Sequence, residues 1–525
     1  MRTSLHHLVE QAAGTRGTAP ALTYRDLTVS YAELWEVTRA MAAGLITLGV
    51  AKDDRVAVYL DKRIETVAAI FGTSAAAGVF VPINHILKAP QAAYIIRNCS
   101  ARVLVTTSDR LALLRTELDA CPSIEHVVVI DLEGKPAPDR ATYQTHAWSN
   151  LICRGTELPN SIRTSIDLDM AAILYTSGST GKPKGVVLSH RNLIVGAESV
   201  SSYLKNRSDD IILSALPLSF DAGFSQLTTA FAVGAHVILL NYLLPGDVPK
   251  LCARHQVTGL TCVPPLWLQI ADLTWSPEAT RSMRYFANTG GRMPRPTLDR
   301  LRAIFPQAKP YLMYGLTEAF RSTYLDPAEV DQRPDSIGKA IPNAEIVVVR
   351  ADGTRCDAGE EGELVHRGAL VALGYWADPV RTAERFKPAP SDQQNWRAPE
   401  LAVWSGDRVV ADEDGFLYFV GRQDEMIKTS GYRVSPTEVE EVAYDSGLVR
   451  DAVALGVDDA RLGQRIVLLV SPRNGAELKS DHLASVMRRQ LPLYMVPSLI
   501  EVRADLPRSP NGKFDRSFLR QEMSS

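Results

Sequence analysis

A loop rich in glycine, hydroxyl and lysine side chains occupies residues 175–185, between two strand-like runs. Its sequence, YTSGSTGKPKG, holds three glycines, four Ser or Thr residues and two lysines in eleven positions. Glycines let backbone N–H groups approach a phosphate closely, hydroxyls donate hydrogen bonds and lysines neutralise charge. The composition therefore predicts a phosphate-binding loop. The alternative is an exposed turn.

This loop differs from two well-known glycine-rich motifs. A Walker A loop requires G-x-x-x-x-G-K-[ST] before a helix, but here Pro183 follows Gly181 and Lys182, and Thr176 stands where the first glycine belongs. The chain contains no G-x-S-x-G, so a nucleophile elbow is not expected. The loop therefore indicates phosphate binding without a serine nucleophile.

Nine further segments with chemistry-bearing or turn-forming residues follow one another along the chain. They are VSYAEL (29–34), GVFVPIN (78–84), LPLSFD (216–221), YGLTE (314–318), GELVHRGALVALGYW (362–376), WSGD (404–407), GRQDEMIKTSGYRVSPTEVE (421–440), LPLYMVP (491–497) and PRSPNGKFDR (507–516). In order and spacing, the ten segments resemble the core motifs of the adenylate-forming (AMP-binding) superfamily. That superfamily includes acyl-CoA synthetases, amino-acid adenylation domains of peptide synthetases, and luciferases.

The resemblance implies an AMP-forming ligase that uses ATP and Mg²⁺. A carboxylate attacks the α-phosphate of ATP to give an acyl-adenylate, and a thiol then displaces AMP. Such chemistry depends on positioning and on charge stabilisation. The residues implied to hold the β- and γ-phosphates are Thr176, Ser177, Ser179, Thr180 and Lys184.

The remaining nucleotide contacts are implied in the same way. Thr317 would touch the α-phosphate, and Glu318 would hold Mg²⁺, because a hard cation that bridges phosphates needs a carboxylate. Lys513 would be the catalytic lysine of the first half-reaction, as a point charge with three donors. The residues implied to bind the adenosine are Tyr314, Gly290, Gly291, Gly315, Asp407 and Arg422. Alone, Glu318 could be a helix N-terminal carboxylate, and Lys513 an exposed lysine after a turn.

The acid-binding segment is expected at 216–225, where Phe220 would act as a gate. The resemblance implies that Asp221 pairs with the ammonium group of an amino-acid substrate, and a buried carboxylate does need a cation. Alternatively, Asp221 caps a following helix. Arg321 could shorten the pocket, bind a polar group of the substrate, or form a structural ion pair. The other candidates for this pocket are Ser225, Met313, Val263, Asn288 and Ser322.

A small C-terminal domain is expected to rotate between the two half-reactions. By resemblance, Asp424 is the hinge, and Lys428 and Gly431 face the active site after rotation, with Gly431 leaving room for a pantetheine arm. Arg433 resembles a basic residue that meets CoA phosphates in some ligases, but it could instead serve a carrier protein.

We expect the helices and strands that position these residues to form an α/β fold. Continuous apolar runs at 55–60, 103–107, 126–130, 171–176 and 236–240 alternate with helix-like segments such as 64–76 and 298–304. That alternation predicts parallel sheets covered on both faces. We expect an N-terminal domain at 1–423 with a β-rich lobe at about 345–421, and an α+β C-terminal domain at 424–525.

Composition narrows the possible functions. The 525 residues carry 57 basic and 60 acidic side chains, a net charge of −3, which argues against a dedicated nucleic-acid or membrane binder. The six cysteines form no C-x-x-C pair, so neither a disulfide framework nor a zinc cluster is expected. The N-terminus lacks an apolar signal-peptide core, and no run of apolar residues is long enough to span a membrane. We expect a cytoplasmic protein.

The leading hypothesis is a free-standing ligase that adenylates an amino acid and loads a separate carrier protein in a secondary-metabolite or cell-envelope pathway. No carrier domain follows Lys513 before Ser525, so the acceptor is expected to be a separate molecule. The main alternative is an AMP-forming acyl-CoA ligase for a specialised acid. An oxidative luciferase and a catalytically inactive nucleotide-binding protein are the remaining alternatives.

Overall fold

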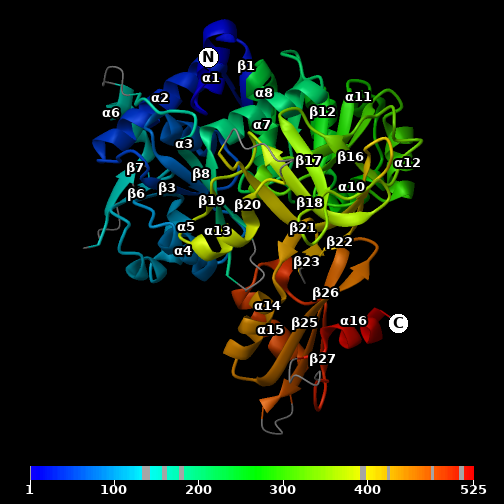
Figure 1. The fold of residues 1–525 in the computed structure, drawn as a ribbon. Helices are drawn as coiled ribbons and strands as arrows, with labels where there is room; N and C mark the ends of the chain where they lie inside the picture. Colours follow the sequence, from blue (N-terminus) through cyan, green and yellow to red (C-terminus); the bar gives the residue numbers. More distant parts are fainter. Residues whose placement is uncertain are drawn as a thin grey trace.

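The computed structural model describes residues 2–132, 142–156, 162–176, 182–390, 398–422, 426–473, 478–507 and 514–524. These residues form a large N-terminal domain and a small C-terminal domain, which hangs below the large one in Figure 1. The fold is mixed α/β, as the sequence predicts.

The larger sheet of the N-terminal domain has fourteen strands. Its central strands are parallel, and antiparallel strands extend it on both sides. In spatial order the strands are β17 (Ala344–Val349), β18 (Glu361–Gly368), β21 (Leu401–Ala411), β22 (Leu417–Arg422), β16 (Ser336–Ala340), β15 (Thr323–Leu325), β14 (Lys309–Tyr314), β13 (Tyr285–Asn288), β12 (Gly259–Cys262), β10 (Ile211–Ser214), β11 (His236–Leu239), β1 (Pro20–Tyr24) and β2 (Leu27–Ser30), with β20 (Phe386–Pro388) beside β21.

The second sheet has eight strands, of which six run parallel. Their order is β19 (Gly374–Tyr375), β9 (Lys184–Ser189), β8 (Met170–Thr176), β4 (Val79–Pro82), β3 (Arg55–Tyr59), β5 (Val103–Thr106), β6 (His126–Val129) and β7 (Gln144–Ala147). The predicted strand runs agree with β3, β5, β6, β8 and β11 to within about a residue at each end, because each is a short apolar run.

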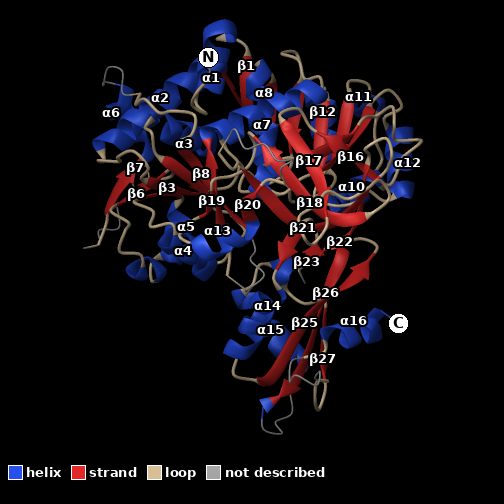
Figure 2. Cartoon of the chain, in the orientation of Figure 1, coloured by secondary structure: helices blue, strands red, loops and turns tan. Residues whose placement is uncertain are grey.

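Helices pack against both sheets of the large domain (Figure 2). They are α1 (His7–Arg16), α2 (Tyr31–Thr47), α3 (Ile64–Ala75), α4 (Ala89–Asn98), α5 (Ser108–Leu114), α6 (Trp148–Thr156), α7 (His190–Tyr203), α8 (Asp221–Val233), α9 (Asp247–His255), α10 (Pro264–Ala271), α11 (Pro277–Thr280), α12 (Arg295–Ile304) and α13 (Pro379–Arg385), with the 3₁₀ turns η1 (Glu117–Ala120) and η2 (Thr317–Ala319). Capping residues in the sequence mark where two of these helices begin. Ser30 and Glu33 form a capping box at α2, and Ser189 and Asn192 form one at α7.

The β-rich lobe predicted from about residue 345 is present, but its sheet is continuous with the large sheet. Strand β16 pairs with β15 on one side and with β22 on the other, which joins the two regions. Strand β19 then reaches across to β9 of the second sheet. The lobe is therefore attached to both sheets.

The small domain has its own five-stranded sheet and its own apolar core. Its elements are β23 (Ile427–Thr429), β24 (Tyr432–Val434), α14 (Pro436–Asp445), β25 (Val449–Asp459), β26 (Gly463–Pro472), α15 (Ser480–Gln490), η4 (Leu493–Met495), β27 (Leu499–Val502) and α16 (Arg516–Ser524). The boundary at 423 and 424 lies outside the described residues. Among the described helices, none combines the length and apolar character that crossing a bilayer requires.

Candidate active site

A cavity of about 1040 Å³ opens where the carboxyl ends of the parallel strands meet the small domain. Residues just after β10, β12, β13 and β14 line one side of it, and the β23–β24 hairpin lines another. Ligands of open α/β sheets bind at this end of the strands because the loops there converge.

The cavity brings together most of the predicted site residues. Those that line it are Thr176, Phe220, Asp221, Val263, Asn288, Gly290, Gly291, Met313, Tyr314, Gly315, Thr317, Arg321, Asp407, Lys428, Gly431 and Arg433. Lys184 and Glu318 are not among the lining residues, and neither are two residues predicted for the acid pocket. Ser225 is buried within α8, where its hydroxyl meets Thr229 at 3.4 Å, and the Ser322 hydroxyl meets His366 Nδ1 at 2.9 Å.

The predicted phosphate and metal residues contact each other. Lys184 Nζ donates to Glu318 Oε1 at 3.0 Å and to the Tyr375 hydroxyl at 2.7 Å. The same hydroxyl donates to Glu318 Oε1 at 2.7 Å. Lys184 begins β9, Tyr375 lies on the paired strand β19, and Glu318 lies in η2, so three elements build this triad.

Glu318 is an ionised carboxylate at the centre of several cations. Burial raises its pKa, but the charges of Lys184, Arg433 and Arg385 lower it by more, and the net pKa lies well below its usual value. An ionised, buried carboxylate fits a hard cation such as Mg²⁺, whereas the Thr317 hydroxyl donates to Asp221 Oδ1 at 3.5 Å. The present contact of Glu318 with Lys184 would have to give way.

Tyr314 and Asp407, which are expected to bind the adenosine, both line the cavity. The Tyr314 hydroxyl donates to the Asp407 carboxylate, which is 1% exposed. Gly290 has φ +77°, which favours glycine. Gly315 closely faces Arg321, since an added Cβ would stand 3.1 Å from the Arg321 Cα. The backbone here therefore approaches the cavity closely.

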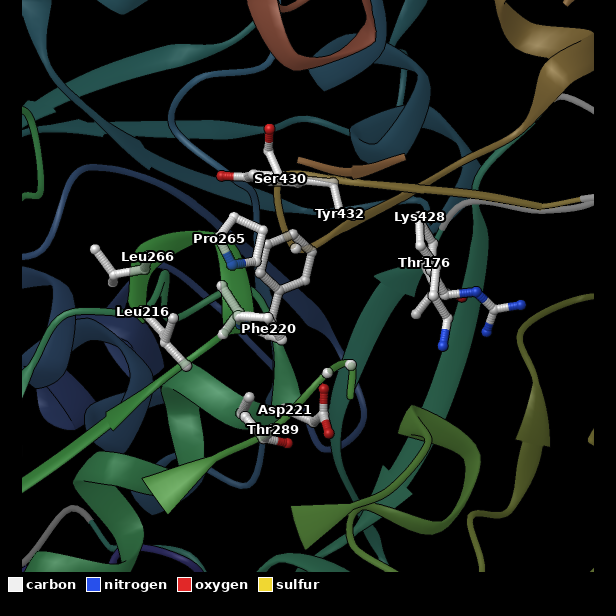
Figure 3. A pocket seen from close by; sticks show the side chains of 18 of the residues that line it. Thr176, Leu216, Phe220, Asp221, Pro265, Leu266, Thr289, Lys428, Ser430 and Tyr432 are labelled. Carbon is white, nitrogen blue, oxygen red and sulfur yellow. The ribbon is translucent and has the colours of Figure 1, made fainter. Parts of the chain in front are cut away.

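The acid side is polar and deeply buried. Arg321 Nη1 donates to Asp221 Oδ2 at 3.4 Å and to Thr289 Oγ1 at 3.3 Å. Figure 3 shows Asp221 and Thr289 side by side beneath the ring of Phe220. Arg321 Nε and Asn288 Oδ1 are buried without a hydrogen-bond partner in the structure. This end of the cavity therefore contains an unpaired donor and an unpaired acceptor that are both shielded from solvent.

Asp221 begins α8, yet its side chain is not the helix cap. The N-cap is Phe220, and no side-chain capping bond is present there. Burial raises the pKa of Asp221, and the charge of Arg321 partly opposes that rise. From the sequence, we expect a substrate ammonium group to compensate the charge of Asp221. In the structure, Arg321 supplies part of that compensation.

The small domain closes the cavity with an aromatic row. Phe220 meets Tyr432 edge to face at 5.4 Å between ring centroids, and Tyr432 stacks on Tyr494 at 3.8 Å. Gly431, with φ +81°, lies so close to Val263 that an added Cβ would stand 2.7 Å from Val263 Cγ2. The β23–β24 hairpin thus brings Lys428 and Gly431 to the cavity wall.

Some predicted residues lie outside the described part of the chain. They are Ser177, Ser179 and Thr180 of the loop, Asp424 of the hinge, and Lys513; the side chain of Arg422 is also outside it. Arg433 lines the cavity, and its charge contributes to the low pKa of Glu318.

Sequence reasoning missed Tyr375 and Lys62. Tyr375 lies in the quoted segment GELVHRGALVALGYW, so the motif itself was the available signal. Lys62 lines the cavity from the loop after β3, and nothing in its local sequence separates it from an exposed lysine.

Comparison with known proteins agrees with this geometry. The AMP-binding enzyme family matches residues 8–376, and the AMP-binding enzyme C-terminal domain matches 438–513. The chain is 29% identical to the long-chain-fatty-acid–CoA ligase of Salmonella typhimurium, over 99% of this chain and 94% of that protein. It is 28% identical to gramicidin S synthase 2 of Aneurinibacillus migulanus, over 95% of this chain and 10% of that much longer protein.

A solved structure matches both domains. It is a double mutant of o-succinylbenzoate CoA synthetase from Bacillus subtilis, bound with a product analogue, at 25% identity and a TM-score of 0.83, covering 99% of this chain and 98% of that one. The chain therefore belongs to the AMP-binding enzyme family, as an AMP-forming ligase that uses ATP to activate a carboxylate.

Proposed function

We propose that this ligase activates a polar, amine-bearing carboxylic acid and passes the acyl group to the phosphopantetheine thiol of a separate carrier protein. The observation that carries the proposal is the acid end of the cavity. Asp221 and Asn288 line it with oxygen acceptors, and Asn288 Oδ1 has no donor in the structure. An ammonium group satisfies such acceptors with its three N–H donors.

A long apolar acid suits this end poorly. Arg321 and Asn288 are each 2% exposed and carry unpaired polar atoms. A ligand group that pairs with such an atom recovers about 1–3 kcal/mol, the penalty of leaving a buried polar group unsatisfied, whereas hydrocarbon leaves that penalty in place. Arg321 could donate its free Nε–H to a second polar group of the acid, such as a carbonyl, while Asp221 faces the amine.

The other residues take the parts of an adenylation site. Thr176, Ser177, Ser179, Thr180 and Lys184 bind the phosphates, and Lys513 acts at the α-phosphate. Tyr314, Gly290, Gly291, Gly315, Asp407 and Arg422 bind the adenosine. Glu318 and Thr317 would hold a Mg²⁺, which would supply positive charge to neutralise the phosphates. Asp424 is the hinge for rotation of the small domain.

The second candidate function is an AMP-forming acyl-CoA ligase, because two of the similar proteins are named as CoA ligases. Gramicidin S synthase 2 points instead toward peptide synthetases. The charge of Arg433 lowers the pKa of Glu318, which is compatible with either acceptor.

The substrate is tested by ATP–pyrophosphate exchange over amino acids, β-amino acids and matched deamino acids. Exchange that requires the amine, and that falls at least about tenfold in Asp221→Asn, is expected. Asp272→Asn is the control, because Asp272 is an exposed aspartate in a surface ion pair with Arg300. Equal exchange with deamino acids, unaffected by Asp221→Asn, contradicts the amine proposal.

The acceptor is tested separately with the best acid. Holo carrier protein and CoA are compared at equal thiol concentration, and thioester formation is followed by mass spectrometry. Faster loading of the carrier protein is expected. Loading of CoA alone identifies the second candidate function.

A further inference from the structure

Lys62 is a buried lysine at the wall of the cavity. It lies between β3 and α3, is 4% exposed, and belongs to the loop at the carboxyl end of the second sheet. Buried lysines are rare unless they are paired. Among the described residues, no carboxylate forms an ion pair with it, and its contacts are backbone carbonyls.

Those carbonyls belong to the segment that leads into the acid site. Lys62 Nζ donates to Ser214 O at 2.8 Å and to Leu216 O at 3.0 Å. The chain then runs to Phe220 and Asp221, which line the acid end of the cavity. One side chain from the second sheet therefore holds two points of a segment that belongs to the first sheet.

Asn241 fixes Lys62 itself. Asn241 Oδ1 accepts from the Lys62 backbone N–H at 2.8 Å, and Asn241 Nδ2 donates to Lys62 O at 2.9 Å. On the other side of the segment, Gln226 Oε1 accepts from Leu216 N–H at 3.3 Å. The segment at 214–221 is thus held between Lys62 and α8.

The titratable groups near Lys62 are Cys262, His85 and Asp61. Burial raises the pKa of the Cys262 thiol far above its usual value, and burial together with the charges of Arg110 and Lys62 lowers the pKa of His85 to about 4. Asp61, the preceding residue, accepts hydrogen bonds from Tyr24 and Asn241. Burial lowers the pKa of Lys62 itself to about 7.

A neutral amine still has two N–H groups, so both carbonyl bonds persist when Lys62 loses its proton. Titration then changes the charge at the cavity wall while the segment stays bonded. A charge buried in a low-dielectric wall acts on a bound carboxylate more strongly than one in water.

We propose that Lys62 is a positioning residue of the acid site: its nitrogen fixes the 214–221 segment that presents Phe220 and Asp221, and its positive charge favours binding of the anionic acid. The second half of this inference rests on the proposed function, because it requires a carboxylate substrate in this cavity. The first half depends on the protein alone.

The first test uses the full-length protein without ligand. Hydrogen exchange of peptides that cover 213–222 is compared among wild type, Lys62→Arg, Lys62→Met and the control Lys250→Met, whose lysine is exposed. Loss of two backbone contacts in Lys62→Met should speed exchange of this segment about tenfold. Lys62→Arg should stay close to wild type. Unchanged exchange in Lys62→Met overturns the positioning role.

The second test measures the KM for the best acid and the KM for ATP between pH 6 and 8.5. In wild type, the KM for the acid should rise about fivefold through pH 7 while the KM for ATP follows no such trend. Lys62→Arg stays charged throughout and should give a flat profile. An identical profile in wild type and Lys62→Arg overturns the charge role. If no acid supports exchange in wild type, the proposed function fails, while the hydrogen-exchange test still decides the positioning role.

Discussion

Tyr375 connects Lys184 and Glu318, the residues expected to bind phosphate and Mg²⁺. Its hydroxyl accepts a hydrogen bond from Lys184 and donates one to Glu318. Burial and the neighbouring Glu318 charge raise the pKa of Tyr375, so the phenol keeps its proton. It can therefore hold the carboxylate without adding charge. Bonds of this kind to ionised groups are worth about 1.5–3 kcal/mol each.

Tyr375→Phe should therefore weaken the handling of ATP. We expect kcat/KM for ATP in the exchange reaction to fall about tenfold to a hundredfold, with little change in the KM for the acid. Initial rates at varied ATP and varied acid measure both. Tyr444→Phe is the matched control, because it removes a hydroxyl that bonds within the small domain. A change in the acid KM with an unchanged ATP dependence would contradict the role of Tyr375.

The sequence predicts the residue types at this site but not their mutual contacts. Lys184 and Glu318 were assigned to phosphate and to metal from their motifs, and the structure shows them 3.0 Å apart in an ion pair. That pairing depends on how β9 and η2 meet across 134 positions of sequence. Asp221 illustrates the same limit, because its partner Arg321 lies 100 positions away. Local pattern carries no information on such long-range pairing.

At the scale of elements, the sequence pattern predicts where strands lie along the chain, but it does not predict which strands pair in a sheet. Apolar runs predicted β3, β5 and β8 closely, because period and composition are local properties. The merging of the β-rich lobe with the large sheet was not predicted. It depends on the register of β16 against β15 and β22, which only the assembled sheet defines.

Gly431, in the turn of the β23–β24 hairpin, lies against Val263 of the cavity wall. A Cβ there would stand 2.7 Å from Val263 Cγ2. Gly431→Ala should therefore keep the hairpin from seating and lower thiol transfer about tenfold or more, as overpacking of about 1–3 kcal/mol implies. Pyrophosphate exchange should change less than about twofold.

Gly447→Ala separates crowding from backbone strain. Gly447 has φ +70°, close to the +81° of Gly431, but an added Cβ would meet nothing within 4 Å. The control should therefore retain thiol transfer. Adding Val263→Ala to Gly431→Ala makes room for the methyl group and should restore part of the rate. Equal loss in Gly431→Ala and Gly447→Ala would show that strain, and not the contact with Val263, is responsible.

At the scale of the whole molecule, the two domains meet through α4 and α14 as well as through the aromatic row. Gln91 Nε2 donates to Glu438 Oε1 at 3.0 Å and approaches Met495 Sδ at 3.7 Å. Burial raises the pKa of Glu438 from its usual value near 4.5 to about 7, opposed by Gln91 and reinforced by Glu441. Tyr494 faces the same carboxyl group, and burial keeps that phenol neutral.

Docking of the small domain in this arrangement should therefore take up a proton. Glu438 would recover its usual pKa when the domains separate, so the docked state binds more protons between pH 4.5 and 7. Docking should be strongest below that window, weaken by at most about tenfold per pH unit across it, and level off above pH 7. Thiol transfer, which needs the hairpin in the site, should weaken in the same window relative to adenylation.

Energy transfer between dyes at Leu113→Cys and Arg489→Cys, with exposed Cys153 replaced by serine, reports the docked fraction from pH 5 to 8. Glu438→Gln removes the proton-linked group but keeps an amide that can bond Gln91. Its docked fraction should be independent of pH and should match wild type near the acid end. Glu441→Gln leaves the buried carboxyl in place, so its pH profile should retain the wild-type slope. If the docked fraction of Glu438→Gln still changes with pH, another group at the interface causes the pH dependence. Glu438 would then carry the same charge in the docked state as in solvent.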